Sequence, residues 1–301
     1  MNRSISHLAF LGTLVVGQNN VEIPLRKTAD DNFIANVSIP TAGVRYVDMK
    51  LSLGNTNTIC HPSVVIGEPR QTLTLNSGSS PSYNFTDWSV LLDTYAASSY
   101  LAIGPDSALT QLTGAVAFIR NDDDNSAKLI VGSQGDTFES YCRPNTSFRV
   151  PMDDGDLIFE SEFRFGAEYT APNIHMRFGP TRNGILFWAP PSLVQNISRA
   201  IEANGGILGR SGGFHNCTQT TITSLPEIRI TVGQREGHVG TLVYYPEDYI
   251  DLRDENRCTL RVQAVGGIVH FTINPLVLPS TNIRISVTNV WTLCDAADPI
   301  A

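Results

Sequence analysis

The chain is built from short apolar and β-branched runs that end at Gly, Pro, Asn or Asp. Runs of this length between turn residues are typical of β-strands. The sequence therefore predicts an all-β protein. Ten runs have this form: Val21–Arg26, Asn32–Ile39, Arg45–Leu53, Gln71–Leu75, Val116–Arg120, Lys128–Val131, Leu157–Phe165, Ile228–Val232, Thr241–Tyr245 and Asn282–Thr288.

One segment has helical periodicity instead. Between Ser192 and Glu202, the apolar residues Leu193, Ile197 and Ile201 recur at i, i+4 and i+8. This spacing puts them on one face of a helix. Ser192 is of the residue type that caps helix N-termini, so the predicted helix begins there.

The length and the charge limit the possible partners. A chain of 301 residues corresponds to roughly two domains of ~150 residues. It has 21 basic and 29 acidic residues, and no stretch concentrates Lys or Arg. We therefore expect no binding to nucleic acid or to an anionic membrane surface. We also expect no membrane span, because no apolar run reaches the ~18 residues that a spanning helix needs.

The cysteines and histidines do not predict a cofactor. The five cysteines have no CxxC or Cys/His spacing, so no metal site is expected. No phosphate loop or dinucleotide fingerprint is present. Because five is odd, at most two disulfides can form within the chain and one thiol remains.

The N-terminus predicts a secreted or lumenal protein. Arg3 precedes the apolar run Leu8–Val16, which ends at Gly17, and this order is typical of a signal peptide over residues 1–17. A retained edge strand is the alternative. In a secreted chain, Asn-x-Ser/Thr sequons are glycosylation candidates. The sequons are at Asn2, Asn36, Asn84, Asn145, Asn196 and Asn216.

Several segments, taken in order, resemble the pepsin-like aspartic peptidases. Tyr100–Pro105 is similar to a buried Asp-Gly-Ile-Leu-Gly strand of that family, and Ser126–Gly132 is similar to its Leu-x-Phe-Gly-Gly strand. The likeness extends from about residue 21 to residue 295. It implies a bilobal all-β fold, with two β-barrel-like lobes around a central cleft and a shared interlobe sheet. The implied lobes are residues 18–148 and 149–301.

The resemblance fails at the catalytic residues. The family uses one aspartate from an Asp-Thr/Ser-Gly motif in each lobe, and the two aspartates share a proton. Neither motif occurs in this sequence. Alignment on the flanking residues puts Ser52 at the first aspartate, with Gly54 retained, and Arg182-Asn183-Gly184 on the second motif. Serine does not ionise near neutral pH and arginine stays cationic, so the carboxylate pair cannot form.

Two other alignments of the first motif stay open. In one, Asn76 takes the place of the first aspartate. In the other, Asp93-Thr94 is the nearest surviving Asp-Thr pair, although Tyr95 replaces the glycine that the motif needs. The span from Gly54 to Tyr100 is short for the family, which implies a shortened or absent flap over the cleft.

The resemblance also implies a pairing of cysteines. Cys217–Cys258 matches a bridge of the family's C-terminal lobe. Cys142 and Cys294 are expected to pair because both lie near strands that should meet between the lobes. Cys60 would then be free.

The leading hypothesis is a non-catalytic pepsin-like protein that uses the bilobal scaffold to bind a peptide or a protein partner. Two alternatives stay open. One is a hydrolase with an unrecognised acid pair that includes Asp93. The other is a β-sandwich structural or coat protein.

Overall fold

The computed structural model describes residues 21–297 except 29–31, 40–43, 54–56, 62, 65–68, 79–81, 89, 122–125, 133–134, 152–157, 168, 179–184, 210–211, 233–239, 267–270, 275, 277–280 and 289. The predicted leader, residues 1–17, lies outside the described residues. None of the helices in the described part of the chain is long and apolar enough to cross a membrane.

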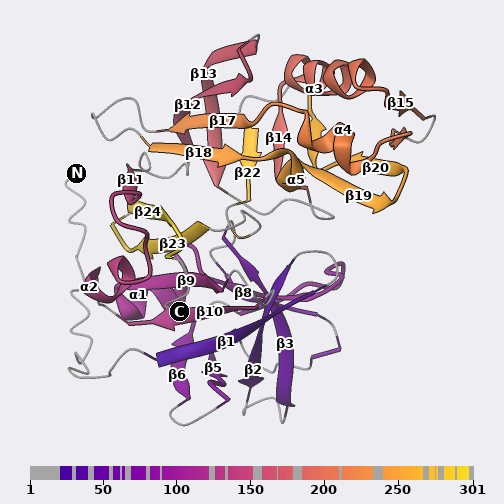
Figure 1. Ribbon diagram of the computed structural model, residues 1–301. Coiled ribbons are helices and arrows are strands. Elements are labelled where there is room, and N and C mark those ends of the chain that lie inside the picture. The colour runs from indigo at the N-terminus through magenta and orange to yellow at the C-terminus, as the bar shows by residue number, and fades with distance from the viewer. Residues whose placement is uncertain are drawn as a thin grey trace, which may run out of the picture.

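Most of the N-terminal half lies in one 13-stranded sheet (Figure 1). Its strands, in spatial order, are β11 (Phe148–Pro151), β24 (Val290–Asp295), β23 (Thr281–Ser286), β9 (Ala115–Asn121), β10 (Ser126–Val131), β1 (Val21–Lys27), β2 (Phe33–Ile39), β3 (Val44–Ser52), β8 (Ser99–Ala102), β4 (Ile59–Cys60) and β7 (Leu91–Leu92). The hairpin of β5 (Gln71–Leu75) and β6 (Tyr83–Asp87) is attached through β2. Strands β23 and β24 come from the end of the chain, and β23 pairs with β9. The sheet therefore joins the two halves.

The C-terminal half contains two smaller sheets. The seven-stranded sheet has the order β18 (Gly240–Tyr244), β17 (Ile228–Val232), β12 (Ile158–Phe165), β13 (Tyr169–Phe178), β22 (Phe271–Ile273), β14 (Phe187–Ala189) and β21 (Val262–Ala264). The four-stranded sheet has the order β15 (Ile207–Leu208), β16 (Phe214–His215), β20 (Arg257–Leu260) and β19 (Ile250–Asp254). The helices are short except for one: α1 (Ala108–Thr113), α2 (Gly135–Glu139), α3 (Pro191–Ala203), α4 (Gln219–Thr223) and α5 (Pro246–Tyr249).

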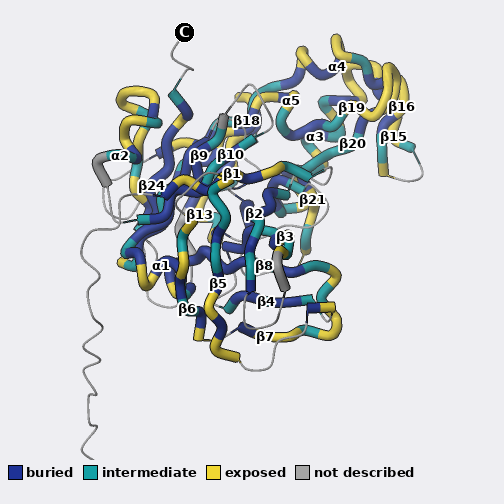
Figure 2. Tube along the Cα trace, turned by 90° about the horizontal axis from the view of Figure 1, so that it is seen from below, coloured by how far each residue is buried: buried dark blue, intermediate teal, exposed yellow. Residues whose placement is uncertain are grey.

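The strands follow the burial pattern that the sequence predicts. In β1, Val21, Ile23 and Leu25 are buried while Glu22 and Arg26 are exposed. All ten predicted runs overlap strands of the structure, so the all-β prediction is confirmed. Buried apolar side chains from both halves form one continuous cluster, which Figure 2 shows as buried tube running through the centre of the molecule.

The predicted helix is confirmed as α3, and its three predicted core residues, Leu193, Ile197 and Ile201, are all buried. The predicted cap is wrong. The helix begins at Pro191, with Pro190 as the N-cap residue and no side-chain cap. Proline is favoured at the first helical position because its φ is already helical and it has no N–H to satisfy.

The lobe boundary at residues 148 and 149 stays a prediction. Strand β11 begins at Phe148 and pairs with β24 in the sheet that joins the halves. Phe148 also packs tightly on β18, because a Cβ added at Gly240 would lie 2.1 Å from its ring.

Candidate functional site

The first turn, residues 53–58, connects β3 to β4, and β8 lies between these two strands. Strand β3 runs parallel to β8, with Ser52 opposite Ala102, and β4 runs antiparallel to β8. The N–H of Ile103 donates to the carbonyl oxygen of Ser52 at 2.9 Å. Ser52 thus ends β3 at the start of the turn that the alignment assigned to the first aspartate.

The Ser52 side chain is buried without a partner. Its Oγ makes no hydrogen bond with any described residue, and the same holds for Oγ1 of the buried Thr58 at the far end of the turn. An unpaired buried hydroxyl costs about 1–3 kcal/mol. The turn therefore carries two polar groups that the described part of the fold leaves unsatisfied.

The second turn, residues 179–186, repeats this arrangement in the C-terminal half. It connects β13 to β14, and β22 lies between them. Strand β13 runs parallel to β22, with Phe178 opposite Ile273, and β14 runs antiparallel to β22. In each half, therefore, two strands that follow one another in the chain lie on either side of a third strand.

The two turns differ in length and in the residue that starts them. The second turn is two residues longer than the first. It follows Phe178, which ends β13 as Ser52 ends β3. The predicted motif residues Gly54, Arg182, Asn183 and Gly184 lie outside the described residues, so the assignment of Arg182 to the second aspartate stays a prediction.

The four segments that form or flank the two turns contain no residue with a carboxylate side chain. Residues 52–58 and 99–105 surround the first turn, and residues 176–190 and 271–276 surround the second. None of these four segments includes Asp or Glu. A shift of the alignment by several residues therefore does not bring an acid into either turn.

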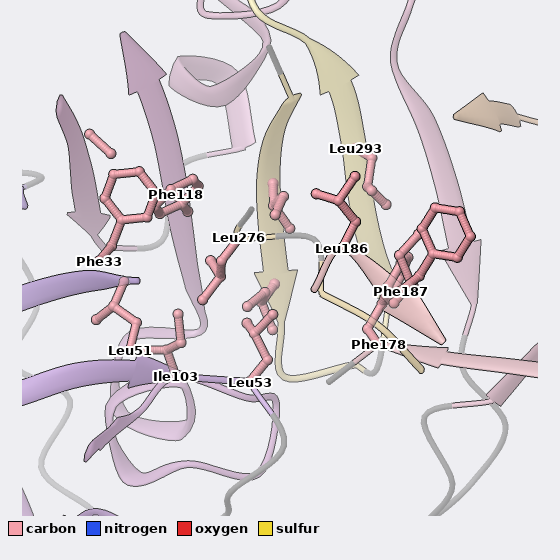
Figure 3. Close-up of a cluster of buried hydrophobic side chains, with 14 of the residues drawn as sticks. Phe33, Leu51, Leu53, Ile103, Phe118, Phe178, Leu186, Phe187, Leu276 and Leu293 are labelled. Carbon is pink, nitrogen blue, oxygen red and sulfur yellow. The ribbon is translucent and has the colours of Figure 1, made fainter. Parts of the chain in front are cut away.

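Described apolar residues next to the two turns belong to one buried cluster. Figure 3 shows Leu53 and Ile103 of the N-terminal half in one cluster with Leu276, Leu186 and Phe178 of the C-terminal half. All five are buried.

Phe178 also connects the second turn to the interlobe sheet. Its ring stacks on that of Trp291 in β24, with the centroids 4.8 Å apart. The strand that leads to the second turn is therefore held by aromatic packing.

The structure places the two alternative positions outside the segments that build the turns. Asn76 follows β5, and its Nδ2 donates to Oδ1 of Asn36 at 2.8 Å. Asp93 follows β7, and its Oδ1 accepts the N–H of Tyr95 at 2.8 Å, so this carboxylate caps its own turn. β7 pairs with β4 on the side opposite β8, and the N–H of Asp93 donates to the carbonyl oxygen of Cys60 in β4 at 3.2 Å.

A β-hairpin lies in the span from Gly54 to Tyr100, for which the sequence predicts a shortened or absent flap. Strands β5 and β6 pair from Gln71–Asp87 to Leu75–Tyr83. Figure 1 shows this hairpin at the end of the N-terminal half that is remote from the C-terminal half. It therefore does not cover the region between the halves.

The structure pairs the cysteines as the resemblance implied. Cys217–Cys258 joins two strand regions of the C-terminal half, and Cys142–Cys294 ties β24 to the N-terminal half. Cys60 is free and buried. Burial, and to a smaller extent the Asp87 carboxylate, raises the pKa of the Cys60 thiol to about 11. This thiol stays protonated near neutral pH and is a poor nucleophile.

The described sequons fall into two groups. Three have an amide nitrogen bonded within the protein: Asn36 to Asp48 at 3.3 Å, Asn196 to the carbonyl oxygen of Ser192 at 2.8 Å, and Asn216 to that of Gly205 at 2.9 Å. Asn84 and Asn145 are exposed. Glycosylation at any of these positions stays a prediction.

The structure also has a surface hollow that no sequence motif indicates. It measures about 430 Å³ in the C-terminal half and is lined by Gln219, Ile222, Glu247, Ile250, Asp251, Leu252, Arg253 and Arg261. Its charges are mixed, and Arg253 pairs with Asp251 at 2.9 Å. No group of His, Cys, Asp or Glu within the described ranges could hold a metal ion.

No protein-family model matches the chain, and no curated protein matches it in sequence. The structure is similar to the crystal structure of basic 7S globulin from soybean, with a TM-score of 0.67 and 8% sequence identity over 93% of this chain and 99% of that chain. A likeness at this identity shows the fold alone. It confirms the predicted all-β, bilobal, pepsin-like architecture and contradicts the β-sandwich alternative, because a sandwich has no pair of turn-bearing lobes.

Proposed function

We propose that this protein is a divergent relative of the pepsin-like aspartic peptidases that lacks both catalytic aspartates and binds a peptide or a protein partner. The observation that carries the proposal is the absence of Asp and Glu from all four segments that build the two turns. Peptide hydrolysis by the aspartic route needs two carboxyl groups that share a proton. Loss of general acid–base catalysis alone removes about 10²–10⁴ in rate.

The surroundings of the turns support a binding protein over an enzyme. Leu53, Ile103 and Phe178 are buried there in an apolar cluster, and the Ser52 hydroxyl has no described partner that could activate it. A serine nucleophile needs an adjacent base to take its proton. The protonated Cys60 thiol offers no substitute.

The compartment forms a second part of the proposal. Two disulfides are typical of secreted or lumenal proteins, because the cytosol keeps thiols reduced. The apolar run Leu8–Val16 and the exposed sequons Asn84 and Asn145 agree with passage through a secretory pathway.

A peptidase assay tests the proposal against the hydrolase alternative. The wild type, Ser52→Ala and Asp93→Asn are incubated with a reduced and alkylated polypeptide between about pH 3 and pH 7, which spans the range where carboxylate pairs titrate. We expect no cleavage by any of the three, as followed by mass spectrometry of the products. Cleavage by the wild type that Asp93→Asn abolishes would establish the hydrolase and end the proposal.

A further inference from the structure

Two arginines flank Thr292 on the sheet that joins the two halves. Arg149 of β11 lies opposite Thr292 of β24, and Arg284 of β23 lies opposite the same threonine from the other side. Figure 1 shows these three strands next to one another between the halves. Residues directly opposite each other in antiparallel strands project from the same face, with Cβ atoms about 4.5–5.5 Å apart. The two arginines therefore share one face, with their Cβ atoms roughly 10 Å apart.

This face of the sheet is the one that points away from the main core. Side chains alternate between the two faces along a strand. Trp291, next to Thr292 in β24, projects from the opposite face and belongs to the main buried cluster. Cys294 projects from the same face as Thr292 and belongs to a separate, smaller cluster. Arg149 is exposed and Arg284 is half-buried, so solvent reaches both at the border of this smaller cluster.

Both arginines lack an ion-pair partner. No ion pair or side-chain hydrogen bond links Arg149 or Arg284 to any residue in the described ranges. Other arginines in these ranges have an acid at 2.5–2.9 Å: Arg26–Asp48, Arg164–Glu162, Arg229–Glu227, Arg253–Asp251 and Arg257–Asp254. Two cations on one face without a carboxylate between them attract an anion.

The other described charges near this face are few. Lys128 and Glu22 pair with each other at 2.9 Å, and their strands β10 and β1 are the second and third neighbours of β23. Asp295 alternates to the opposite face. The Glu139 carboxylate of α2 accepts the hydroxyl of Ser147, the residue before β11, at 3.2 Å. Glu139 is therefore the described acid that opposes binding of an anion next to β11.

We propose that Arg149 and Arg284 form a binding site for a doubly charged tetrahedral oxyanion, phosphate or sulfate. Each guanidinium is a planar fork that donates two parallel hydrogen bonds to a pair of oxygens. A carboxylate has one charge and one pair of oxygens, so it satisfies one fork. A tetrahedral dianion matches both charges and presents an edge of two oxygens to each fork. The long arginine side chains span the distance between the two strands.

The fold holds the backbone of this site in place. β11 pairs with β24 along its whole length, and β23 pairs with both β24 and β9. Cys294, two residues after Thr292, is bonded to Cys142. An anion therefore orders two side chains and no main chain, which lowers the entropy cost of binding. The site does not involve the interlobe turns, so it is independent of the proposed function.

Calorimetric titration of the full chain with inorganic phosphate and with sulfate, at an ionic strength held constant with chloride, tests the proposal. We expect saturable binding of one anion per chain at pH 8. The second pKa of a phosphate group is about 6. At pH 5.5 phosphate is therefore mostly a monoanion and should bind several-fold more weakly. Sulfate stays doubly charged at both pH values, so its affinity should not change.

Matched variants test where the anion binds. Arg149→Gln and Arg284→Gln should each weaken binding at least about tenfold, because each removes charge-assisted hydrogen bonds. Arg199→Gln, at an exposed arginine of α3 that also has no described ion pair, is the control and should leave binding unchanged. Glu139→Gln should strengthen binding, since it removes the opposing charge. Far-UV circular dichroism and unfolding curves verify that each variant folds.

Four outcomes would overturn the proposal. These are no saturable binding of either anion at pH 8, wild-type affinity in either Arg149→Gln or Arg284→Gln, and acetate binding as tightly as sulfate. The fourth concerns Asp153, Asp154 and Asp156, which follow β11 in the sequence. Anion binding that appears only when these three are changed to Asn would show that the arginines bind acids of this chain. Failure of the proposed function has a different signature, because cleavage of a polypeptide does not depend on the arginine variants.

Discussion

The two halves of the molecule build the same turn from unrelated residues. In the N-terminal half, β3 ends on the small and polar Ser52, whose hydroxyl is buried without a described partner. In the C-terminal half, β13 ends on Phe178, whose ring stacks on Trp291. In both halves the strand pairs with a parallel neighbour, and an antiparallel strand returns on its other side. The backbone arrangement is thus supported by strand pairing and apolar burial, and it does not depend on an acid in the turn.

The halves also differ in how they are cross-linked. The C-terminal half has the internal Cys217–Cys258 bridge, whereas the N-terminal half keeps Cys60 as a buried free thiol. The N-terminal half is completed instead by strands β23 and β24 from the end of the chain. We expect the C-terminal half to depend more on its aromatic packing and its bridge.

The largest expected effect is that of Phe178→Ala. Removal of a fully buried aromatic ring costs about 3–5 kcal/mol, because the lost contacts leave a cavity beside Trp291. Chemical denaturation measures the loss in the free energy of unfolding. Tyr46→Ala, at an aromatic residue in β3 that is 65% exposed, is the matched control and should cost less than about 1 kcal/mol. Equal losses from the two variants would contradict the packing role of Phe178.

Removal of the C-terminal bridge should have the next largest effect. The bridge closes a separation of 41 residues, and Cys217→Ala/Cys258→Ala should lower the free energy of unfolding by about 2–4 kcal/mol, since the unfolded chain gains entropy. Cys60→Ala removes a buried thiol without opening a bridge and should cost about 1 kcal/mol. A loss for the double variant no greater than that for Cys60→Ala would show that the bridge contributes little.

The smallest expected effect is the difference in stability loss between alanine substitutions at two buried serines near the first turn. Ser99 Oγ accepts the N–H of His61 at 2.9 Å, whereas Ser52 Oγ has no described partner. Ser99→Ala should therefore cost about 1 kcal/mol, while Ser52→Ala should be neutral or slightly stabilising. Equilibrium unfolding of the two variants compares them directly. A loss at Ser52 as large as the loss at Ser99 would mean that the Ser52 hydroxyl is bonded in solution.

Much of the fold could be predicted because many of its strands have one buried face and one exposed face. Strand β1 alternates buried and exposed residues, and this pattern is visible in the sequence. Strands β4, β7, β15 and β16 are each two residues long, which is too short for any periodicity. The ten-residue β13 is absent from the predicted runs because Pro172 and Asn173 interrupt it, although Ile174–Phe178 alternates apolar and polar residues as a half-buried strand does.

The candidate site, like the fold, could be predicted from the sequence only in part. The order of motifs was enough to indicate a pepsin-like chain, and the absence of Asp-Thr/Ser-Gly is a property of the sequence itself. The position of Phe178 at the second turn had no signal in the sequence, because a sequence does not distinguish an aromatic residue stacked on Trp291 from one exposed to solvent.

The sequence by itself determined the β-strand content, the buried face of α3 and the lack of acids around both turns, because these depend on local pattern and residue type. Only the tertiary structure decided that β3 lies beside β8, that β13 lies beside β22, and that β23 and β24 return to complete the N-terminal sheet. These pairings join residues far apart in the chain. They depend on which surfaces bury one another, and no local pattern encodes that choice.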